Sequence, residues 1–406
     1  MMFNEIELSS VITDIAAGPF GSNLKVSCFV PYGFPIIDGA NLKGFKVTDN
    51  LTKFVTEEKA RSLSRSIARR GDVIITISGT LGQIAYIPDD SMFEEYLCSQ
   101  RQFRVSFDSS RVYVPYLVFY FHTNEGQGKI LSFANQTGVP ALSQPLKNFR
   151  KIRIQLPSYT EQRRIASVIE AINDKIECNQ KVNDNLQQQA AAIFRSWFVD
   201  CDLFGGKAPD EWENVTLEDI TALVSRGITP KYADDTDQIV INQKCVRNHM
   251  IDLSLARTHT PKVINEKWLR FGDLLINSTG DGTLGRAAQV WFQPKNLTVD
   301  SHVTIVRPAK ENLIFYIGLW GILHEKEIES LHTGSTGQTE LPRDRVKAME
   351  LRLPDNDTLD RFNALITPMA AAIVANQEEN NQLAALRDAI LPKLMSGEID
   401  VSAVQL

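Results

Sequence analysis

The side chains of this sequence that could do chemistry are cations, amides and hydroxyls gathered in a few short polar segments. Arginine presents paired donors that suit guanine, whereas asparagine and glutamine present the donor and acceptor that suit adenine. Lysine, arginine and backbone N–H groups suit phosphate oxygens. The candidate DNA-contacting residues are Arg61, Arg65, Arg69, Thr80, Gln83, Gln100, Gln136, Thr137, Gln144, Lys147, Thr283, Arg286, His302, Thr336, Gln338, Arg343 and Arg345. As groups they predict contact with double-stranded DNA, although any one of them also fits an ordinary solvated surface position.

The spacing of these residues predicts where they sit. Arg61, Arg65 and Arg69 follow the spacing of one helix face, within a short helix expected over Thr56–Arg69. That basic face could equally pair with the glutamates of the same helix. The loop Ser78–Gln83 exposes backbone N–H groups beside polar side chains, and its counterpart in the second half begins at Thr279. Gln100 and His302 lie in matching segments, 202 positions apart.

Catalytic and metal-binding patterns are absent from the sequence. It contains no GxxxxGK[ST], HExxH, GxSxG or GxGxxG string and no Asn-Pro-Pro-aromatic string of an amino-methyltransferase. The six histidines have no ligand spacing, and the five cysteines form no CxxC pair. We therefore expect no catalytic residue, metal ion or cofactor in this chain.

The bulk composition bounds the class of protein. The net charge of −6 points weakly away from nucleic acid, but binding depends on local basic faces rather than on the total. There is no run of eighteen apolar residues, so no membrane span is expected. The scattered thiols and the lack of a signal-peptide pattern at the N-terminus predict a protein of the reducing cytoplasm.

An internal repeat organises the chain. Gly71-Asp72 and the glycine loop that follows recur as Gly272-Asp273 and a similar loop, 201 positions later. The sequence therefore predicts two copies of a mixed, mainly β domain, each followed by a long helix. Within the first copy, short helices are also expected over Leu8–Ala17 and Tyr113–Phe121.

The long helices carry a heptad pattern. The segment from Thr160 to Trp197 has no proline or glycine, and Ser158 and Glu161 fit a capping box at its start. Alternating steps of four and three residues give one seam of Ile165, Ile169, Ile172, Ile176, Asn179, Asn183, Leu186, Ala190, Ile193 and Trp197, and a second, 197 positions later, of Phe362, Ile366, Met369, Ile373, Asn376, Asn380, Leu383, Arg387, Ile390 and Leu394. These are the seams of a coiled coil, and the second helix is expected to kink at Pro368 and Pro392.

The asparagines predict how the two helices pair. If the helices pack antiparallel, Asn179 faces Asn380 and Asn183 faces Asn376 in an otherwise apolar seam. Sliding the helices would leave buried amides unpaired at a cost of about 1–3 kcal/mol each, which would fix the register. The alternative is that these residues lie at a wet edge of the seam and only lower stability.

The repeated strings carry a family resemblance. Gly-Asp and Gly-Thr-Leu-Gly occur twice, Leu-Pro precedes each long helix, and the helices end in Ala192–Asp200 and Ile390–Asp400. In this order they resemble the specificity (S) subunit of type I restriction–modification enzymes. The resemblance implies an α+β fold with a pseudo-two-fold repeat, in which two target-recognition domains are joined by two long antiparallel coiled-coil helices. The expected division is 1–157 and 201–354 for recognition domains 1 and 2, 158–200 for helix 1 and 355–406 for helix 2 with the C-terminal segment.

The resemblance also implies a function. Each recognition domain reads one half of a bipartite, asymmetric DNA sequence, and the helices span the unread spacer. Two methyltransferase (M) subunits that carry S-adenosylmethionine dock on the subunit, and restriction-translocase (R) subunits join them, while the S subunit itself catalyses nothing. Two other readings stay open: an assembly scaffold that reads no DNA, and an enzyme with unrecognised motifs.

Overall fold

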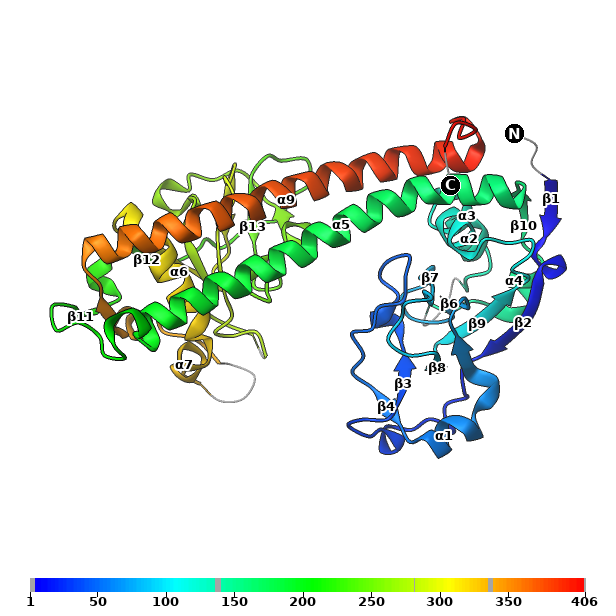
Figure 1. Cartoon of the computed structure of the whole chain (residues 1–406), viewed down its shortest axis with the longest axis horizontal. Coiled ribbons are helices and arrows are strands. Elements are labelled where there is room, and N and C mark those ends of the chain that lie inside the picture. The colour runs from blue at the N-terminus through cyan, green and yellow to red at the C-terminus, as the bar shows by residue number, and fades with distance from the viewer. Residues whose placement is uncertain (1–3, 136–139, 281, 335–338, 405–406) are drawn as a thin grey trace. The chain divides into compact units, whose positions relative to one another are not determined.

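The computed structural model describes residues 4–135, 140–280, 282–334 and 339–404. The chain divides into two compact units: unit 1 consists of residues 1–176 and 381–406, and unit 2 of residues 177–380. Each unit therefore contains a globular part and one half of each long helix (Figure 1). None of the helices in the described ranges is long and apolar enough to cross a membrane.

Unit 1 is built on two four-stranded sheets and one strand pair. The first sheet has the order β2-β9-β6-β7, with bounds Ile12–Ala17, Gln102–Phe107, Val73–Thr76 and Ile84–Tyr86. The second has the order β4-β3-β8-β5, with bounds Phe54–Val55, Phe34–Ile37, Glu95–Cys98 and Ile67–Arg69. β1 (Asn4–Glu7) pairs with β10 (Arg153–Leu156), and β10 directly precedes the first long helix.

Unit 2 repeats this plan. Its four-stranded sheet has the order β12-β20-β17-β18, with bounds Thr221–Arg226, Val303–Pro308, Leu274–Asn277 and Ala287–Gln289. A three-stranded sheet has the order β16-β13-β19, with bounds Arg257–Thr258, Ile239–Ile241 and Leu297–Val299. The hairpin β14 (Val246–Arg247) and β15 (Met250–Ile251) and the pair β11 (Glu213–Thr216) and β21 (Glu350–Leu353) complete it.

The strand registers confirm the duplication. Val73 pairs with Val105 in unit 1, and 201 positions later Leu274 pairs with Val306 in unit 2. The edge strands β2 and β12 even carry an irregularity at the same place in their pairing with β9 and β20. A bulge that recurs in both copies is a feature of the scaffold and not a local accident. The α+β fold class with an internal repeat is therefore confirmed.

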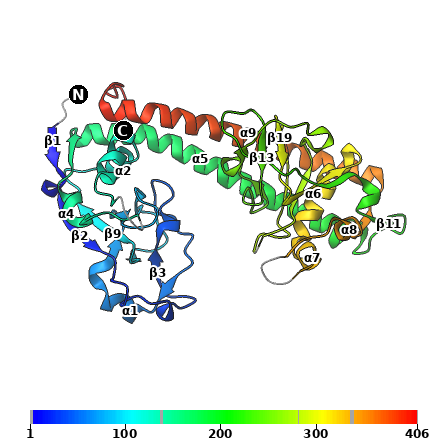
Figure 2. The ribbon, with the colours of Figure 1, turned by 180° about the vertical axis from the view of Figure 1, so that it is seen from behind.

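Helices pack on these sheets in the same order in both units. Unit 1 has α1 (Glu57–Ser62), α2 (Val114–Phe121), α3 (Asn124–Leu131) and α4 (Pro145–Arg150), and unit 2 has α6 (Ile314–Leu323), α7 (Glu325–Ser330) and α8 (Arg343–Lys347). α2 is buried almost along its whole length, and it lies between α5 and β9 in both views (Figures 1 and 2). In each unit the largest core cluster thus contains residues of a four-stranded sheet and of both long helices.

Of the three short helices expected from the sequence, one is wrong, one is confirmed only in its first half and one is confirmed. Leu8–Ala17 forms one 3-10 turn and the strand β2, because its apolar residues pair with β9. Thr56–Arg69 is helical only over α1 and then becomes β5, which pairs with β8. Pairing in a sheet overrode the helical pattern in both segments. Tyr113–Phe121 contains α2, as expected.

The long helices are α5 (Tyr159–Phe194), which continues into a π-helical turn at Arg195–Val199, and α9 (Asn356–Ser396). The capping box at the start of α5 is present: Glu161 N–H donates to the Ser158 hydroxyl, and Ser158 N–H donates to the Glu161 carboxylate. α9 continues through Pro368 and Pro392 as one helix. In each unit the two helix segments run antiparallel, because residues with higher numbers in α5 contact residues with lower numbers in α9.

Candidate nucleic-acid interface

The candidate interface is formed by loops at one end of the sheets, and glycines let these loops approach one another. A Cβ at Gly18 would lie 1.8 Å from the Ser99 carbonyl oxygen, and one at Gly227 would lie 1.9 Å from that of Val299. The glycine loops have positive φ at the same places: 94° at Gly79 and 104° at Gly280. Only glycine adopts such angles without strain, so the repeated glycines are explained by the shape of the loops.

In unit 1 these loops enclose a groove of about 670 Å³. Three of the predicted residues, Thr80, Gln83 and Gln100, line it. Lys53 and Arg101 also line it, and the sequence analysis missed both of them. The groove thus brings amides and cations from three loops to one place, which is the combination that base and phosphate recognition requires.

Several of these polar groups are already used within the protein. The Gln83 side chain donates to the Gly39 carbonyl at 3.1 Å and accepts from the Thr76 hydroxyl at 3.2 Å. The Gln100 amide donates to the carbonyls of Gly21 and Leu24. These two glutamines hold the neighbouring loops in place, and the oxygen side of Gln100 is the part that remains for a ligand.

The groove has one internal ion pair. Lys53 Nζ lies 2.6 Å from Asp38 Oδ2. Burial acts to raise the pKa of Asp38, but the hydrogen bonds from Lys53 and from the Ala40 N–H outweigh it, so this pKa lies below its ordinary value. Asp38 is therefore ionised at neutral pH and neutralises Lys53.

Arg101 is the cation of the groove that stays available. Its side chain is exposed and makes no hydrogen bond or ion pair with any described residue. Its backbone carbonyl accepts from Ile77 N–H at 2.6 Å, which fixes the residue beside the glycine loop. An arginine held by its backbone with a free guanidinium suits recognition of guanine or phosphate.

The backbone contacts also correct the predicted match between the two halves. Ser278 N–H donates to the His302 carbonyl at 2.8 Å, just as Ile77 N–H donates to that of Arg101. The counterpart of His302 is therefore Arg101, 201 positions earlier, and not Gln100. The shift of 201 set by the Gly-Asp strands continues through this loop without the extra residue that we had assumed.

In unit 2 the corresponding loops hold a different set of side chains. His302 Nδ1 lies 2.7 Å from the Thr279 hydroxyl, and the Thr283 hydroxyl donates to the Thr279 carbonyl at 3.2 Å. Arg286 Nη2 donates to the Gly282 carbonyl at 2.7 Å. Predicted Thr283, Arg286 and His302 thus lie around one loop.

The segments that precede α4 and α8 contain other predicted residues and run beside the glycine loops. Gly79 N–H donates to the Pro140 carbonyl, and Leu341 N–H donates to that of Ser278. Gln144 directly precedes α4, Lys147 lies on α4 and Arg343 lies on α8, and all three are exposed. Arg345, also on α8, donates to the Leu331 and His332 carbonyls. Gln136, Thr137, Thr336 and Gln338 lie outside the described residues.

Arg61, Arg65 and Arg69 do not share a helix face, since α1 ends at Ser62 and Arg69 lies on β5. Arg61 and Arg69 instead converge on Glu95, at 2.6 and 2.9 Å. Burial acts to raise the pKa of Glu95, but the hydrogen bonds from the two arginines lower it below its ordinary value. The predicted pairing with Glu57 is also present for Arg61. The shared ion pairs give this cluster a structural role on the second sheet.

The seam asparagines are in contact as the antiparallel arrangement predicts. Asn179 Nδ2 donates to Asn380 Oδ1 at 2.9 Å, and Asn376 Nδ2 donates to Asn183 Oδ1 at 2.8 Å. Asn179 and Asn183 are each only 3% exposed. Asn179 also donates to a Glu379 carboxylate oxygen. Whether these bonds fix the register stays a prediction.

No group of three His, Cys, Asp or Glu side chains within the described part of the chain could hold a metal ion. The five cysteines are free thiols.

Duplicated loops with amides and cations, which enclose a groove in unit 1, are typical of a DNA sequence-recognition protein, and comparison with known proteins gives the same class. Residues 30–188 match the family model of the type I restriction modification DNA specificity domain. The chain therefore carries a DNA specificity domain of this kind over these residues, and it is similar to specificity subunits of type I restriction enzymes.

Individual relatives cover nearly the whole chain. The MjaIX specificity subunit of Methanocaldococcus jannaschii is 24% identical over 374 residues, which cover 86% of this chain and 82% of that protein. The HindI specificity subunit of Haemophilus influenzae is 20% identical over 415 residues, which cover 83% of this chain and 88% of that protein. The crystal structure of a type I restriction–modification S subunit from M. genitalium superposes with a TM-score of 0.56 at 12% identity, covering 97% of this chain and 96% of that one, and thus shares the fold.

Proposed function

We propose that the chain reads a bipartite, asymmetric DNA sequence, with one half read by the loops of each unit. The observation that carries this proposal is that equivalent backbone positions hold different polar side chains. Arg101 and His302 occupy one such pair of positions. Gln83 and Arg286 occupy another, because their carbonyls accept from Thr76 and Asn277 N–H respectively.

This difference is what two separate readers need. Arginine at one position favours guanine, whereas histidine at the equivalent position has a single ring with a different donor pattern. A scaffold that merely bound protein partners would have no reason to keep the loops and change the side chains that line them. The two half-sites are accordingly expected to differ in sequence.

The partners follow from the same proposal. Two methyltransferase subunits would dock on the chain and supply S-adenosylmethionine, and restriction-translocase subunits would complete the enzyme. The long helices would set the length of the unread spacer between the half-sites. The proteins would act together in the cytoplasm, where the free thiols stay reduced.

The decisive experiment exchanges the first recognition domain. Residues 1–157 are replaced by those of another specificity subunit, and the methylated sequence is mapped in a genome that carries the methyltransferase gene. Only one half-site should change, because the other is read by loops of unit 2. A change in both half-sites, or in neither, would contradict the proposal of two independent readers.

The alternative function is an assembly scaffold without DNA readout, which the coiled-coil seam and the net charge of −6 would also allow. Mobility shifts of DNA by the complex with methyltransferase subunits, measured at several salt concentrations, distinguish DNA readout from a scaffold role. DNA readout predicts a steep decline of affinity with salt and a preferred sequence. A scaffold predicts neither.

A further inference from the structure

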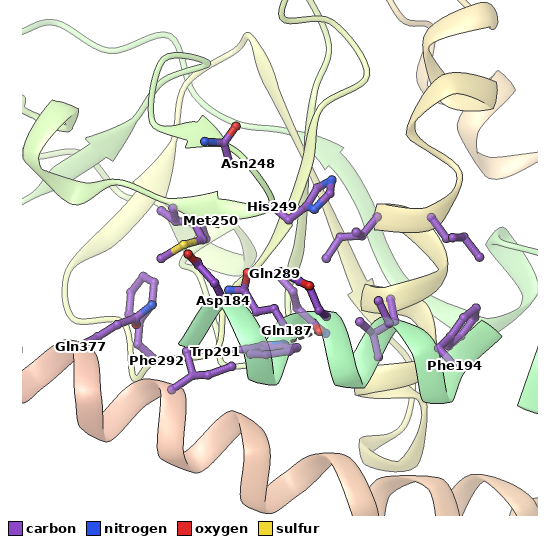
Figure 3. A pocket seen from close by; sticks show the side chains of 17 residues that line it. Asp184, Gln187, Phe194, Asn248, His249, Met250, Gln289, Trp291, Phe292 and Gln377 are labelled. Atoms are coloured by element: carbon purple, nitrogen blue, oxygen red, sulfur yellow. Dashed lines mark hydrogen bonds between the residues drawn. The ribbon is translucent and has the colours of Figure 1, made fainter. Parts of the chain in front are cut away.

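Unit 2 contains a pocket that has no part in the proposed DNA interface. It is a pocket of about 440 Å³ between α5, α6, α9, β18 and the hairpin of β14 and β15. Its wall is mainly apolar, and Phe194, Trp291 and Leu323 contribute to it. Figure 3 shows Asp184 and Gln187 rising from α5 on the side of the hairpin, with His249 above them. This size and lining are those of a small-molecule site.

The internal repeat identifies the same place in unit 1. The turn that carries His249 is closed by a hydrogen bond from Asp252 N–H to the Cys245 carbonyl, at 2.8 Å. In unit 1, Thr48 N–H donates to the Asn41 carbonyl at 3.1 Å and closes a turn of equal length. Phe45 therefore holds the position that His249 holds in unit 2.

In unit 1 this place is filled by side chains. The Phe45 ring lies 4.8 Å from that of Phe119 and 4.5 Å from that of His122, measured between centroids. From α9, the Arg387 guanidinium lies 5.4 Å from the centroid of Phe45. A ring and a cation, both supplied by the chain itself, thus occupy the space between the turn and the long helices.

In unit 2 each of these groups is replaced. His249 stands for Phe45, and its Nε2 lies 3.3 Å from a Glu325 carboxylate oxygen. Leu323 stands for His122, since His324 and Thr123 accept the equivalent backbone bonds from Ile328 and Gln127. By the repeat of the two seams, Ala190 stands for Arg387. The phenyl ring is replaced by the smaller imidazole of His249, which lines the pocket. The guanidinium is lost, and Ala190 itself is buried in the core beside the pocket residue Ala191.

The charge of the pocket fits a cation. Among the described residues that line it, Asp184 is the one carboxylate, and no lysine or arginine is present. Asp184 is exposed and makes no hydrogen bond or ion pair with the described part of the chain. The amides of Gln187, Gln188 and Gln377 stand beside it and can accept further N–H groups.

From these observations we infer that the pocket of unit 2 binds a small aromatic amine. The aromatic ring lies beside His249, against Trp291 and Leu323. The ammonium group pairs with Asp184. This ligand site is separate from DNA recognition, and its test does not depend on the proposed function.

The experiment is a calorimetric titration of the purified full chain with phenethylamine. The matched probes are phenylacetate, which keeps the ring and reverses the charge, and hexylamine, which keeps the amine and lacks the ring. We expect saturable binding of one phenethylamine per chain, with weaker binding of both other probes. Asp184→Asn, an exposed helix position, should weaken phenethylamine binding about fivefold while leaving phenylacetate no weaker.

A second variant refills the pocket from its own wall. Ala191→Phe, at a position of α5 that lines the pocket, should abolish phenethylamine binding, and circular dichroism checks that the chain still folds. If that variant does not fold, Asp184→Asn decides the question by itself. Absence of saturable binding to the wild-type chain would overturn the inference, as would equal affinity for phenylacetate or undiminished binding in the folded refilled variant. A pocket that takes an aromatic side chain of a partner protein would give the first of these negative results.

Discussion

At the scale of single residues, the candidate readers are those whose backbone is fixed and whose side chain is free. Arg101 meets both conditions, because Ile77 N–H holds its carbonyl while its guanidinium has no partner among the described residues. Gln83 and Gln100 meet only the first, since their amides hold neighbouring loops. Removal of either glutamine should therefore loosen the groove as well as change its contacts.

Arg101→Ala should relax the base preference in one half-site by about 1–3 kcal/mol, the range for loss of a paired arginine contact. His302→Ala is the matched variant and should affect the other half-site. Competition binding with single-base variants of the target measures both. If Arg101→Ala weakened binding equally for all sequences, and lowered the salt dependence by about one charge, Arg101 would be a phosphate contact and not a reader.

A buried ion pair gives a residue-scale prediction of stability. Arg307 donates to both carboxylate oxygens of Asp273, which is 1% exposed. In unit 1, Ser106 takes the position of Arg307 and donates to Asp72, where burial raises the pKa above its ordinary value. The same turn carboxylate thus has a guanidinium at 2.7 Å in unit 2, whereas in unit 1 the Ser106 hydroxyl and the Arg69 N–H donate to it and its cation, Arg104, lies 3.9 Å away.

Arg307→Met should destabilise unit 2 by about 3–5 kcal/mol, because it leaves the Asp273 charge buried without its partner. Ser106→Ala should cost about 1 kcal/mol in unit 1. All five tryptophans lie in unit 2, so urea unfolding followed by tryptophan fluorescence reports on that unit. Equal effects of the two substitutions on their own units would show that the charge is compensated in another way.

At the scale of elements, the seam of the long helices combines apolar burial with two amide pairs. Asn183→Ala should destabilise by about 1–3 kcal/mol, because it leaves the Asn376 amide without its acceptor in the seam. Asn183→Leu combined with Asn376→Leu should be neutral or stabilising, yet should allow the helices to slide. Unfolding curves measure the first effect, and distances between spin labels on the two helices measure the second. Exposed Gln180→Ala is the control.

The register prediction fails if the double leucine variant keeps one narrow distribution of label distances. In that case apolar packing alone would fix the register, and the asparagines would only lower stability. A result of this kind would leave the antiparallel pairing itself untouched, since that rests on the whole length of the seam.

The sequence predicted these elements correctly where a pattern extended over many residues, and failed where the pattern covered only a short segment. The asparagine pairs could be found because a heptad repeat over ten seam positions fixes which residues face one another. The structure of residues 56–69 could not be predicted, because the helical spacing there is local, whereas β5 is determined by its pairing with β8. Arg101 was missed for a similar reason: the match of His302 depends on a loop whose length only the backbone hydrogen bonds reveal.

At the scale of the whole molecule, the proposed ruler predicts that the preferred spacer depends on helix length. Seven residues are inserted between Ile176 and Glu177 and seven between Gln382 and Leu383, points that lie opposite each other given the pairing of Asn179 with Asn380. A full heptad keeps the seam in phase and adds roughly 10 Å to each helix. At 3.4 Å per base pair, the preferred spacer should grow by about three base pairs. Methylation mapping measures the preferred spacer.

Four residues inserted near Asn183 in α5 alone lengthen one helix by ~6 Å, break the register and should abolish activity or change the spacer. A spacer that stays the same in the active heptad variant would exclude the helices as the ruler, because the half-sites would then be positioned by contacts that do not depend on helix length.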